Sequence, residues 1–183
     1  MLWEPSPEQI ERAAITRYQR WLAETRGLSF DSYAALWDWS VTEIEAFWES
    51  IFQFFQIKAH SPYTQVLPDR AMPGARWFPG ATVNYTEHAL ARHDNHPAVL
   101  FRSETAPLRQ ITYRELSEQV GAAAAGLRRL GIGPGDRVAG YLPNTPEALI
   151  AFLATASIGA IWSCCSPDFG VRSVVDQIGR AHV

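Results

Sequence analysis

The sequence has few cysteines, little net charge and no long apolar run, and each shortage excludes a class of protein. The two cysteines, Cys164 and Cys165, are adjacent, so they offer neither a disulfide framework nor metal-ligand spacing, as is usual in a reducing compartment. The net charge of -3 includes no basic block, which argues against nucleic acid as a partner. No run of about 18 apolar residues and no leader-like N-terminus occurs. We therefore expect a cytosolic protein without a membrane span.

Aromatic residues are abundant, and they are placed unevenly along the chain. Twelve of the 22 aromatic residues lie within residues 1–60. With 183 residues, of which 47% are hydrophobic, the chain has enough apolar material to form a packed core. The change in composition predicts two parts, an aromatic helical part followed by a part of different character.

The beginning of the chain predicts one helix between Ser6 and Gly27. Ser6 followed by Pro7 and Gln9 has the pattern of a capping box, and glycine is the preferred residue just past a helix end. Apolar residues between these signals recur at helical spacing, namely Ile10, Ala14, Tyr18, Trp21 and Leu22. A second helix is expected to begin near Asp31 or Ser32.

A third helix is predicted to open at Ser40, because Ser40 and Glu43 have the spacing of a second capping box. Its apolar residues form one stripe at helical spacing: Ile44, Phe47, Trp48, Ile51, Phe52 and Phe55. The stripe fits packing against the rest of the protein, a neighbouring domain or a membrane surface. The polar side of this helix carries glutamates and no basic residue that could meet anionic lipid, which favours packing.

Beyond an irregular, proline-rich linker over residues 59–80, the chain alternates strands and helices. Strands are expected at 98–101, 109–112, 137–142 and 160–165, with helices opened by a Thr112–Glu115 capping box and spanning about 146–157. The first of these helices is expected to bury Leu116, Val120, Ala123, Leu127 and Leu130. This alternation predicts an α/β fold with a parallel sheet and right-handed crossovers.

Ligands of such sheets bind at the carboxyl ends of the strands, which here lead into loops starting at Pro143 and Ser166. Gly131, Gly133 and Gly135 superficially resemble a dinucleotide-binding run. They follow a helix and precede a strand, however, which is the reverse of that fingerprint and favours a helix cap and turn. The sequence also lacks a Walker-type phosphate loop and a nucleophile elbow.

Two further groups of residues have side chains that could form a chemical site. His88, His93, Asp94 and His96 could ligate a metal, but their spacing fits no standard site and favours an ordinary surface loop. Cys164 could be a nucleophile, but it lies in an apolar strand without a nearby base. We therefore expect both cysteines to be buried.

Three stretches of the sequence resemble the start of an AMP-forming acyl-CoA synthetase of the adenylate-forming superfamily. They are RWFPGATVNYTEHAL (residues 76–90), ITYRELSEQV (residues 111–120) and the long stretch from GIGPGDRVAGYLPN to CSPDFGVRSVVDQ (residues 131–177). The tryptophan-rich first 60 residues and the SPDFG motif are most similar to the branch that activates acetoacetate. Acetate or propionate is the alternative substrate.

The resemblance implies a ligase with two steps. A carboxylate such as acetoacetate attacks the α-phosphate of Mg-ATP, and the thiol of coenzyme A then displaces AMP from the acyl-adenylate. The phosphate loop, hinge aspartate and catalytic lysine of the family match no position in these 183 residues, so no catalytic or metal-binding residue is assigned. The coenzyme A channel of the family is approached near Ser166, Pro167, Asp168, Phe169 and Gly170. None of ATP, Mg²⁺ or coenzyme A is expected to bind this segment tightly.

The resemblance also suggests how the chain is divided. Residues 1–75 are expected to be a helical N-terminal extension with its linker, and residues 76–177 the incomplete start of the AMP-binding (adenylation) domain. The last six residues, IGRAHV, depart from the family pattern and fit the translation of a common sequencing adapter, so we expect residues 178–183 to be foreign to the protein. A stand-alone interaction module without catalysis remains the alternative to an inactive piece of a ligase.

Overall fold

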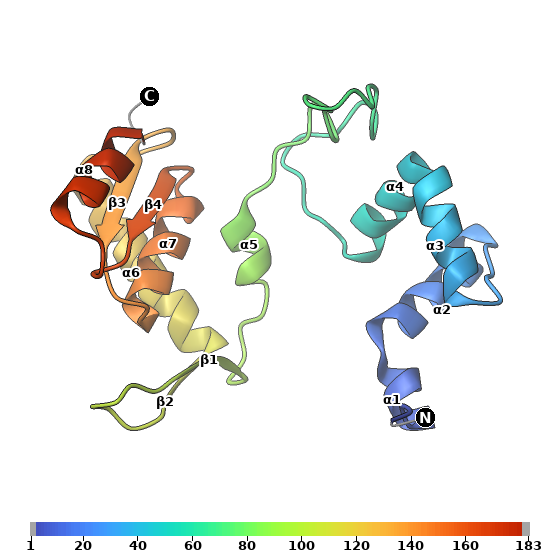
Figure 1. Ribbon diagram of the computed structural model, residues 1–183, viewed down its shortest axis with the longest axis horizontal. Helices are drawn as coiled ribbons and strands as arrows, with labels where there is room; N and C mark the ends of the chain where they lie inside the picture. The colour runs from blue at the N-terminus through green and yellow to red at the C-terminus, as the bar shows by residue number, and fades with distance from the viewer. Residues whose placement is uncertain (1–2, 181–183) are drawn as a thin grey trace. The chain divides into compact units, whose positions relative to one another are not determined.

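The computed structural model describes residues 3–180 and divides into two compact units, with the boundary between Val83 and Asn84. The first unit contains helices and a long linker, and the second alternates helices with short strands (Figure 1). The predicted class, an α/β fold preceded by helices, is confirmed. Among the described residues, no helix is both long and apolar enough to cross a membrane.

The first unit begins with two helices where the sequence predicted one. Helix α1 (Pro7–Arg12) starts with the predicted capping box at Ser6, and α2 (Ala14–Arg26) ends at Gly27 with a φ of 66°. Between the helices, Ala13 is extended with a ψ of 139°. The hydroxyl of Thr16 donates to the Ile10 carbonyl across this break at 2.6 Å. The single-helix prediction is wrong because neither glycine nor proline marks the break.

The boundary between the next two helices also differs from the prediction. Helix α3 (Tyr33–Thr42) is capped by Ser32, as expected, but it continues through Ser40. The Ser40 hydroxyl donates to the Trp37 carbonyl at 2.7 Å, a bond that serine commonly makes inside a helix. Helix α4 (Ile44–Phe54) starts after Glu43, without a side-chain cap. The predicted capping box at Ser40 is therefore wrong.

The apolar stripe of α4 packs in two directions within the first unit. Toward α2 and α3, Phe47, Ile51 and Phe54 pack against the buried side chains Tyr18, Leu22 and Leu36. On another side, Trp48 contacts Trp77, and Phe52 contacts Tyr63 and Phe78, with ring centroids 5.0–5.6 Å apart. The predicted packing of the stripe is confirmed within this unit for most of its residues, but it is wrong for two of them, since Trp48 is 41% and Phe55 59% exposed.

The irregular linker was expected, and the described residues 59–80 contain no helix or strand. In this region Ser61 and Thr82 form an isolated antiparallel bridge. The linker is thus held by backbone bonds within itself and by aromatic and polar contacts with α4, such as the Arg70–Glu45 ion pair at 3.3 Å, rather than by a sheet.

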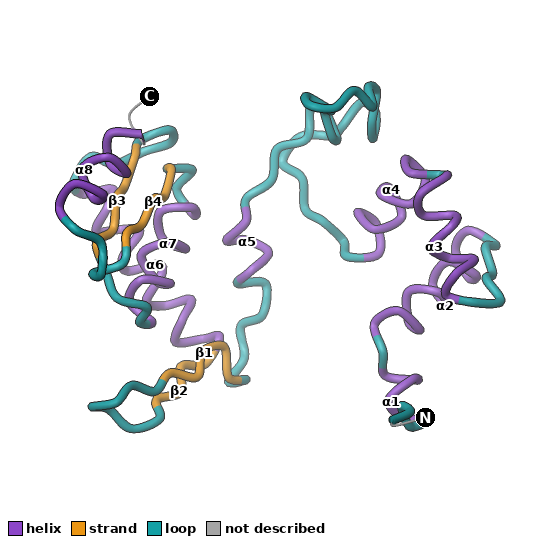
Figure 2. Tube along the Cα trace, in the orientation of Figure 1, coloured by secondary structure: helices purple, strands orange, loops and turns teal. Residues whose placement is uncertain are grey.

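The second unit contains two separate pairs of strands (Figure 2). Its elements are α5 (Tyr85–Ala89), β1 (Pro97–Phe101), β2 (Arg109–Thr112), α6 (Tyr113–Arg129), β3 (Arg137–Tyr141), α7 (Pro146–Ser157), β4 (Ile161–Cys165) and α8 (Val171–Arg180). Strands β1 and β2 are antiparallel, whereas β3 and β4 are parallel and joined through α7. The predicted strand–helix–strand unit is confirmed.

The core of the second unit lies between α6 and α7. Leu116, Val120 and Ala124 of α6 belong to one buried cluster with residues of α7, namely Ile150, Leu153 and Ala154. The Thr112–Glu115 capping box that opens α6 is confirmed. Leu130 is 80% exposed, so its predicted burial is wrong. The reason is that Leu130 caps the helix and lies past the last turn that faces α7.

The end of the described chain is helical. Ile178 is part of α8, which the structure follows as far as Arg180. Residues 181–183, which belong to the predicted foreign tail, lie outside the described residues, and the proposed origin of that tail stays a prediction.

Helix α7 supplies a matched test of the core. Leu153 is 3% exposed and Leu149 on the same helix is 37% exposed. We expect Leu153→Ala to lower the free energy of unfolding by about 2–5 kcal/mol, because it removes buried methyl groups and leaves a cavity. Leu149→Ala should lower the free energy of unfolding by a clearly smaller amount. Urea unfolding followed by circular dichroism measures both, and equal losses would contradict the assignment of the core.

Candidate functional site

The carboxyl ends of β3 and β4 lie side by side. In the parallel register Tyr141 is opposite Cys165, and the ladder continues where the Leu142 amide donates to the Cys165 carbonyl at 3.2 Å. The loops that follow both strands therefore begin at the same edge of the sheet. This edge is where ligands of parallel sheets usually bind.

The loop of Ser166–Gly170, called the strand-end loop below, holds all five residues predicted from the family resemblance. The Ser166 hydroxyl donates to the Asp168 carboxylate at 3.0 Å, and the Phe169 amide donates to the Ser166 carbonyl at 3.0 Å. These local bonds form a turn directly before α8. Phe169 is 44% exposed, so its ring is available to a ligand.

Tyr141, at the end of β3, reaches the strand-end loop from the neighbouring strand. Its hydroxyl donates to the Pro167 carbonyl at 2.9 Å and is also 3.3 Å from the Phe169 carbonyl. The sequence analysis missed this residue. The signal available was weak, a tyrosine as the last residue of a strand that leads into a candidate loop.

Gly140 allows the two strands to lie as they do near this edge. A Cβ atom at Gly140 would come within 2.5 Å of the Trp162 ring, a distance that real Cβ atoms do not reach. The indole of Trp162 on β4 therefore lies across β3 where that strand has no side chain. Substitution of Gly140 would force the indole to move.

The second loop at this edge leads into α7. At the start of α7, the backbone amide of Glu147, the Thr145 side chain and the Arg109 guanidinium hold the pKa of the Glu147 carboxyl below its ordinary value. Arg109 on β2 contacts Glu147 at 3.2 Å, and both side chains are at least half exposed. Glu147 is thus suited to an ion pair rather than to a role as a general base with a raised pKa.

Of the histidine group predicted to be an ordinary surface loop, His93, Asp94 and His96 lie in the loop before β1, but His88 lies in α5, so the prediction is wrong for His88. Asp94 pairs with Arg92 at 2.8 Å and accepts a bond from the His96 amide at 2.9 Å, and these bonds lower the pKa of Asp94. The His96 ring stacks on Tyr113, with centroids 6.5 Å apart. Within residues 3–180, no three His, Cys, Asp or Glu side chains are grouped so that they could hold a metal ion.

The cysteines differ from the prediction. Cys165 is buried, as expected, but Cys164 is exposed. Adjacent residues of a strand point to opposite faces of the sheet, and the face that carries Cys164 is not covered there. The predicted burial of Cys164 is therefore wrong.

The glycine run is a turn, as predicted, since Gly131 and Gly135 take φ values of 87° and 85° between α6 and β3.

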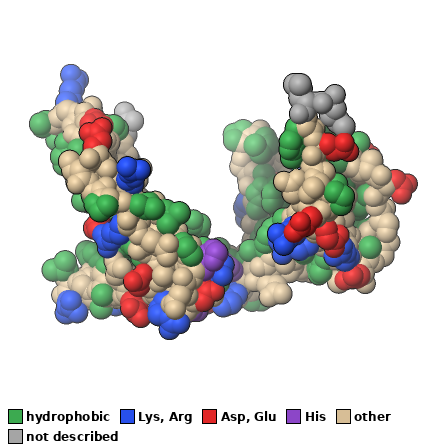
Figure 3. All heavy atoms as spheres, turned by 90° about the horizontal axis from the view of Figure 1, so that it is seen from below, with side chains coloured by type: hydrophobic (Ala, Val, Ile, Leu, Met, Phe, Trp, Pro, Cys, Tyr) green, Lys and Arg blue, Asp and Glu red, His purple; other side chains and the backbone are tan. Residues whose placement is uncertain are grey.

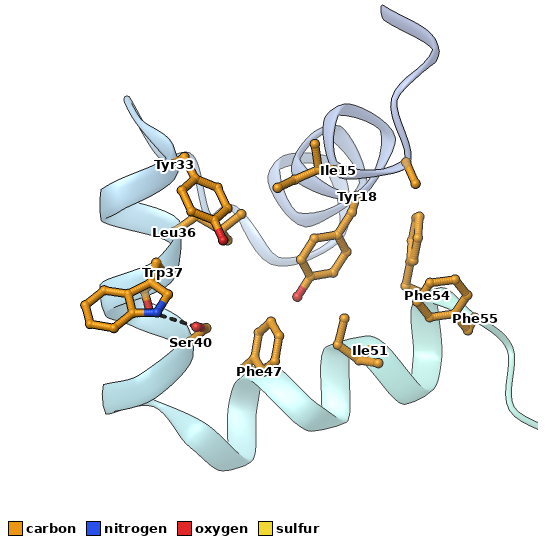
Figure 4. A pocket seen from close by; sticks show the side chains of 11 residues that line it. Ile15, Tyr18, Tyr33, Leu36, Trp37, Ser40, Phe47, Ile51, Phe54 and Phe55 are labelled. Atoms are coloured by element: carbon orange, nitrogen blue, oxygen red, sulfur yellow. Dashed lines mark hydrogen bonds between the residues drawn. The ribbon is translucent and has the colours of Figure 1, made fainter. Parts of the chain in front are cut away.

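A cavity of about 260 Å³ lies in the first unit, between α2, α3 and α4 (Figure 4). Its walls are Ala14, Ile15, Tyr18, Tyr33, Leu36, Trp37, Ser40, Phe47, Ile51, Phe54 and Phe55. No charged side chain is among them, so the cavity offers nothing that could neutralise a phosphate or take a proton from a substrate.

The buried Ser50 hydroxyl beside this cavity both donates and accepts a hydrogen bond. Ser50 donates to the Phe47 carbonyl at 2.6 Å, so it accepts the hydrogen bond that joins it to the Tyr18 hydroxyl at 2.6 Å. Burial raises the pKa of Tyr18 above 10.0 and outweighs the lowering by Ser50 and Arg26.

Figure 3 shows that charged side chains of both signs are interspersed on the face in view rather than gathered into a patch of one sign.

Comparison with known proteins assigns the chain to a family. A family model described as AMP-binding enzyme matches residues 86–183, and one described as acetyl-coenzyme A synthetase N-terminus matches residues 33–89. Since the first model covers more than half of the chain, the chain belongs to the AMP-binding enzyme family.

Within that family, the chain is homologous to acetoacetyl-CoA synthetases. The Rhizobium meliloti (strain 1021) protein is 40% identical over 179 residues, which cover 98% of this chain and 28% of that protein. The Rattus norvegicus protein is 36% identical over 185 residues, which cover 98% of this chain and 27% of that protein. A solved acetoacetyl-CoA synthetase from Streptomyces lividans matches with a TM-score of 0.89 and 50% identity, over 98% of this chain and 28% of that one. The chain thus spans little more than a quarter of the length of these relatives.

The buried tyrosine predicts a dependence of stability on pH. In the unfolded chain Tyr18 ionises near its ordinary pKa of 10.0, whereas the fold keeps it protonated to higher pH. The stability that this difference provides is present below pH 10 and is lost as the pH rises toward the raised pKa of the folded state.

We expect Tyr18→Phe to destabilise the protein by about 1 kcal/mol at pH 7, through loss of its hydrogen bond. The difference in the free energy of unfolding between this variant and the wild type should become smaller above pH 10. Urea unfolding from pH 7 to 11, with the 67% exposed Tyr33→Phe as control, measures the effect. A difference in the free energy of unfolding that stays constant with pH would contradict the predicted contribution of Tyr18.

Proposed function

We propose that this segment belongs to an AMP-forming ligase that joins acetoacetate to coenzyme A. The observation that carries the proposal is the match to the Streptomyces lividans acetoacetyl-CoA synthetase, at 50% identity over 98% of this chain. In the first step an acetoacetate oxygen attacks the α-phosphorus of ATP, and the bond to pyrophosphate breaks. In the second, the sulfur of coenzyme A attacks the acyl carbon, and the bond to AMP breaks. The products are acetoacetyl-CoA, AMP and pyrophosphate.

In that reaction, this segment would help to bind coenzyme A and would supply no group that reacts. The described residues offer no group that fits Mg²⁺, so no step through the metal is assigned to them. We place the approach of coenzyme A at the strand-end loop, where the exposed Phe169 and a turn of backbone groups lie at the carboxyl edge of β3 and β4. Residues 1–75 would then be the extension and linker, and residues 76–177 the start of the adenylation domain.

Acetate or propionate is the second candidate substrate. The match of residues 33–89 to the model named for the acetyl-coenzyme A synthetase N-terminus supports it. The higher coverage by acetoacetyl-CoA synthetases, which match 98% of the chain, favours acetoacetate.

The decisive experiment is to sequence the genomic DNA beyond codon 177 independently and to express the complete reading frame. We expect the complete protein to release pyrophosphate when given acetoacetate and ATP, and to form AMP and acetoacetyl-CoA when coenzyme A is added. The 183-residue chain should release none, because the phosphate loop and catalytic lysine implied by the family resemblance, which would stabilise the charge on phosphorus, match no position in it.

The control reactions contain acetate or propionate in place of acetoacetate. Higher kcat/KM with acetate would replace acetoacetate by the second candidate. A stop codon after Val183 in the independent sequence, together with an inactive protein, would reject the ligase and leave a non-catalytic interaction module.

A further inference from the structure

The strand-end loop depends on a contact that comes from far away in the sequence. Its local bonds, between Ser166 and the two residues Asp168 and Phe169, close the turn but do not tie it to β3. The Tyr141 hydroxyl makes that link, at 2.9 Å to the Pro167 carbonyl and 3.3 Å to the Phe169 carbonyl. A single hydroxyl proton is shared between two acceptors, with the shorter bond the stronger.

The two acceptors lie on either side of Asp168. The Pro167 carbonyl belongs to the peptide unit between Pro167 and Asp168, and the Phe169 carbonyl to the unit between Phe169 and Gly170, so the contact sets the orientation of these two units. Phe169, whose ring is 44% exposed, is held by the same contact. Fixing these two positions fixes how the loop presents its side chains and backbone amides to a ligand.

Tyr141 itself has no direct chemical role in this arrangement. Its hydroxyl proton points to backbone carbonyls of the loop, so it is not free to act as an acid toward a substrate. Half of the side chain is exposed, at 53%, and the hydroxyl is nevertheless bound to the loop. What the residue contributes is the position of the loop.

We propose that Tyr141 is the positioning residue of the strand-end loop, and that it serves the transfer of the acyl group to coenzyme A rather than the formation of the adenylate. This assignment rests on the proposed function, which brings coenzyme A to that loop. Loss of the hydroxyl leaves the loop in place but lets the peptide units that follow Pro167 and Phe169 rotate.

The first experiment uses Tyr141→Phe in the complete enzyme, with the two half-reactions measured separately. We expect the KM for coenzyme A to rise about 3- to 10-fold, the range that corresponds to one lost hydrogen bond. Acetoacetate-dependent exchange of pyrophosphate into ATP, which needs no coenzyme A, should keep its kcat and its KM for ATP. Tyr85→Phe, which removes a hydroxyl from a 63% exposed ring in the same unit, should change neither half-reaction.

The outcomes separate the two proposals. An inactive unmutated enzyme counts against the proposed function. An active enzyme in which Tyr141→Phe leaves the KM for coenzyme A unchanged, or slows both half-reactions equally, overturns the role of Tyr141.

The second experiment needs no catalysis and uses the 183-residue chain itself. Hydrogen exchange should speed up several-fold at the amides of Asp168 and Phe169 in Tyr141→Phe, while the amides of β4 keep their wild-type rates. Unchanged exchange at both loop amides would overturn the positioning role whatever the enzyme does.

Discussion

The packing of α6 against α7 is the contact on which the rest of the second unit depends. Ala124 and Ala154, both almost fully buried, stand where the two helices meet, and such small side chains let helix backbones approach closely. Leucine, isoleucine and valine side chains around them fill the remaining space. Because α7 connects β3 to β4, its position decides where β4 begins. Two backbone bonds then join the strands at their start, from Gly135 to Gly159 at 2.9 Å and from Ile161 to Asp136 at 2.7 Å.

Polar contacts extend this arrangement to the segment before the sheet. The last carbonyls of a helix lack partners within the helix, and the Asn84 amide donates to those of Ala156 and Ser157 at 3.0 and 3.4 Å. Thr86 donates to the Leu153 carbonyl at 2.9 Å in the buried core. The end of α7 is thus satisfied by the short segment that opens the unit, so the chain before β1 and the helix before β4 are fixed together.

The features that could be predicted from the sequence are those with a local cause. The bounds of α7, Pro146–Ser157, and the capping boxes at Ser6 and Thr112 follow from residues a few positions apart. The break at Ala13 could not be predicted, because no residue there disfavours a helix. The exposure of Cys164 depends on which elements cover one face of β4, and the local pattern does not contain that information.

The candidate site divides in the same way between local and distant causes. Ser166–Gly170 could be found because the strand before it is apolar and its motif resembles a family. Tyr141 could not, since it lies 26 residues before Pro167 and meets it only after β3 and β4 pair in register. Sequence analysis therefore locates the loop, whereas the contact that holds the loop appears only when the fold brings the two strand ends together.

The cavity between α2, α3 and α4 and the carboxyl edge of β3 and β4 offer shape and polarity rather than a cluster of charge. The cavity of the first unit is walled by apolar side chains and three hydroxyl-bearing residues, and the edge of the second offers backbone groups, a turn and an ion pair. Phosphoryl and acyl transfer need groups that neutralise developing negative charge. The parts present instead hold a surface in a defined shape, through a buried helix pair and a tyrosine bound to a loop. Under the proposed function, such parts would serve to orient a substrate.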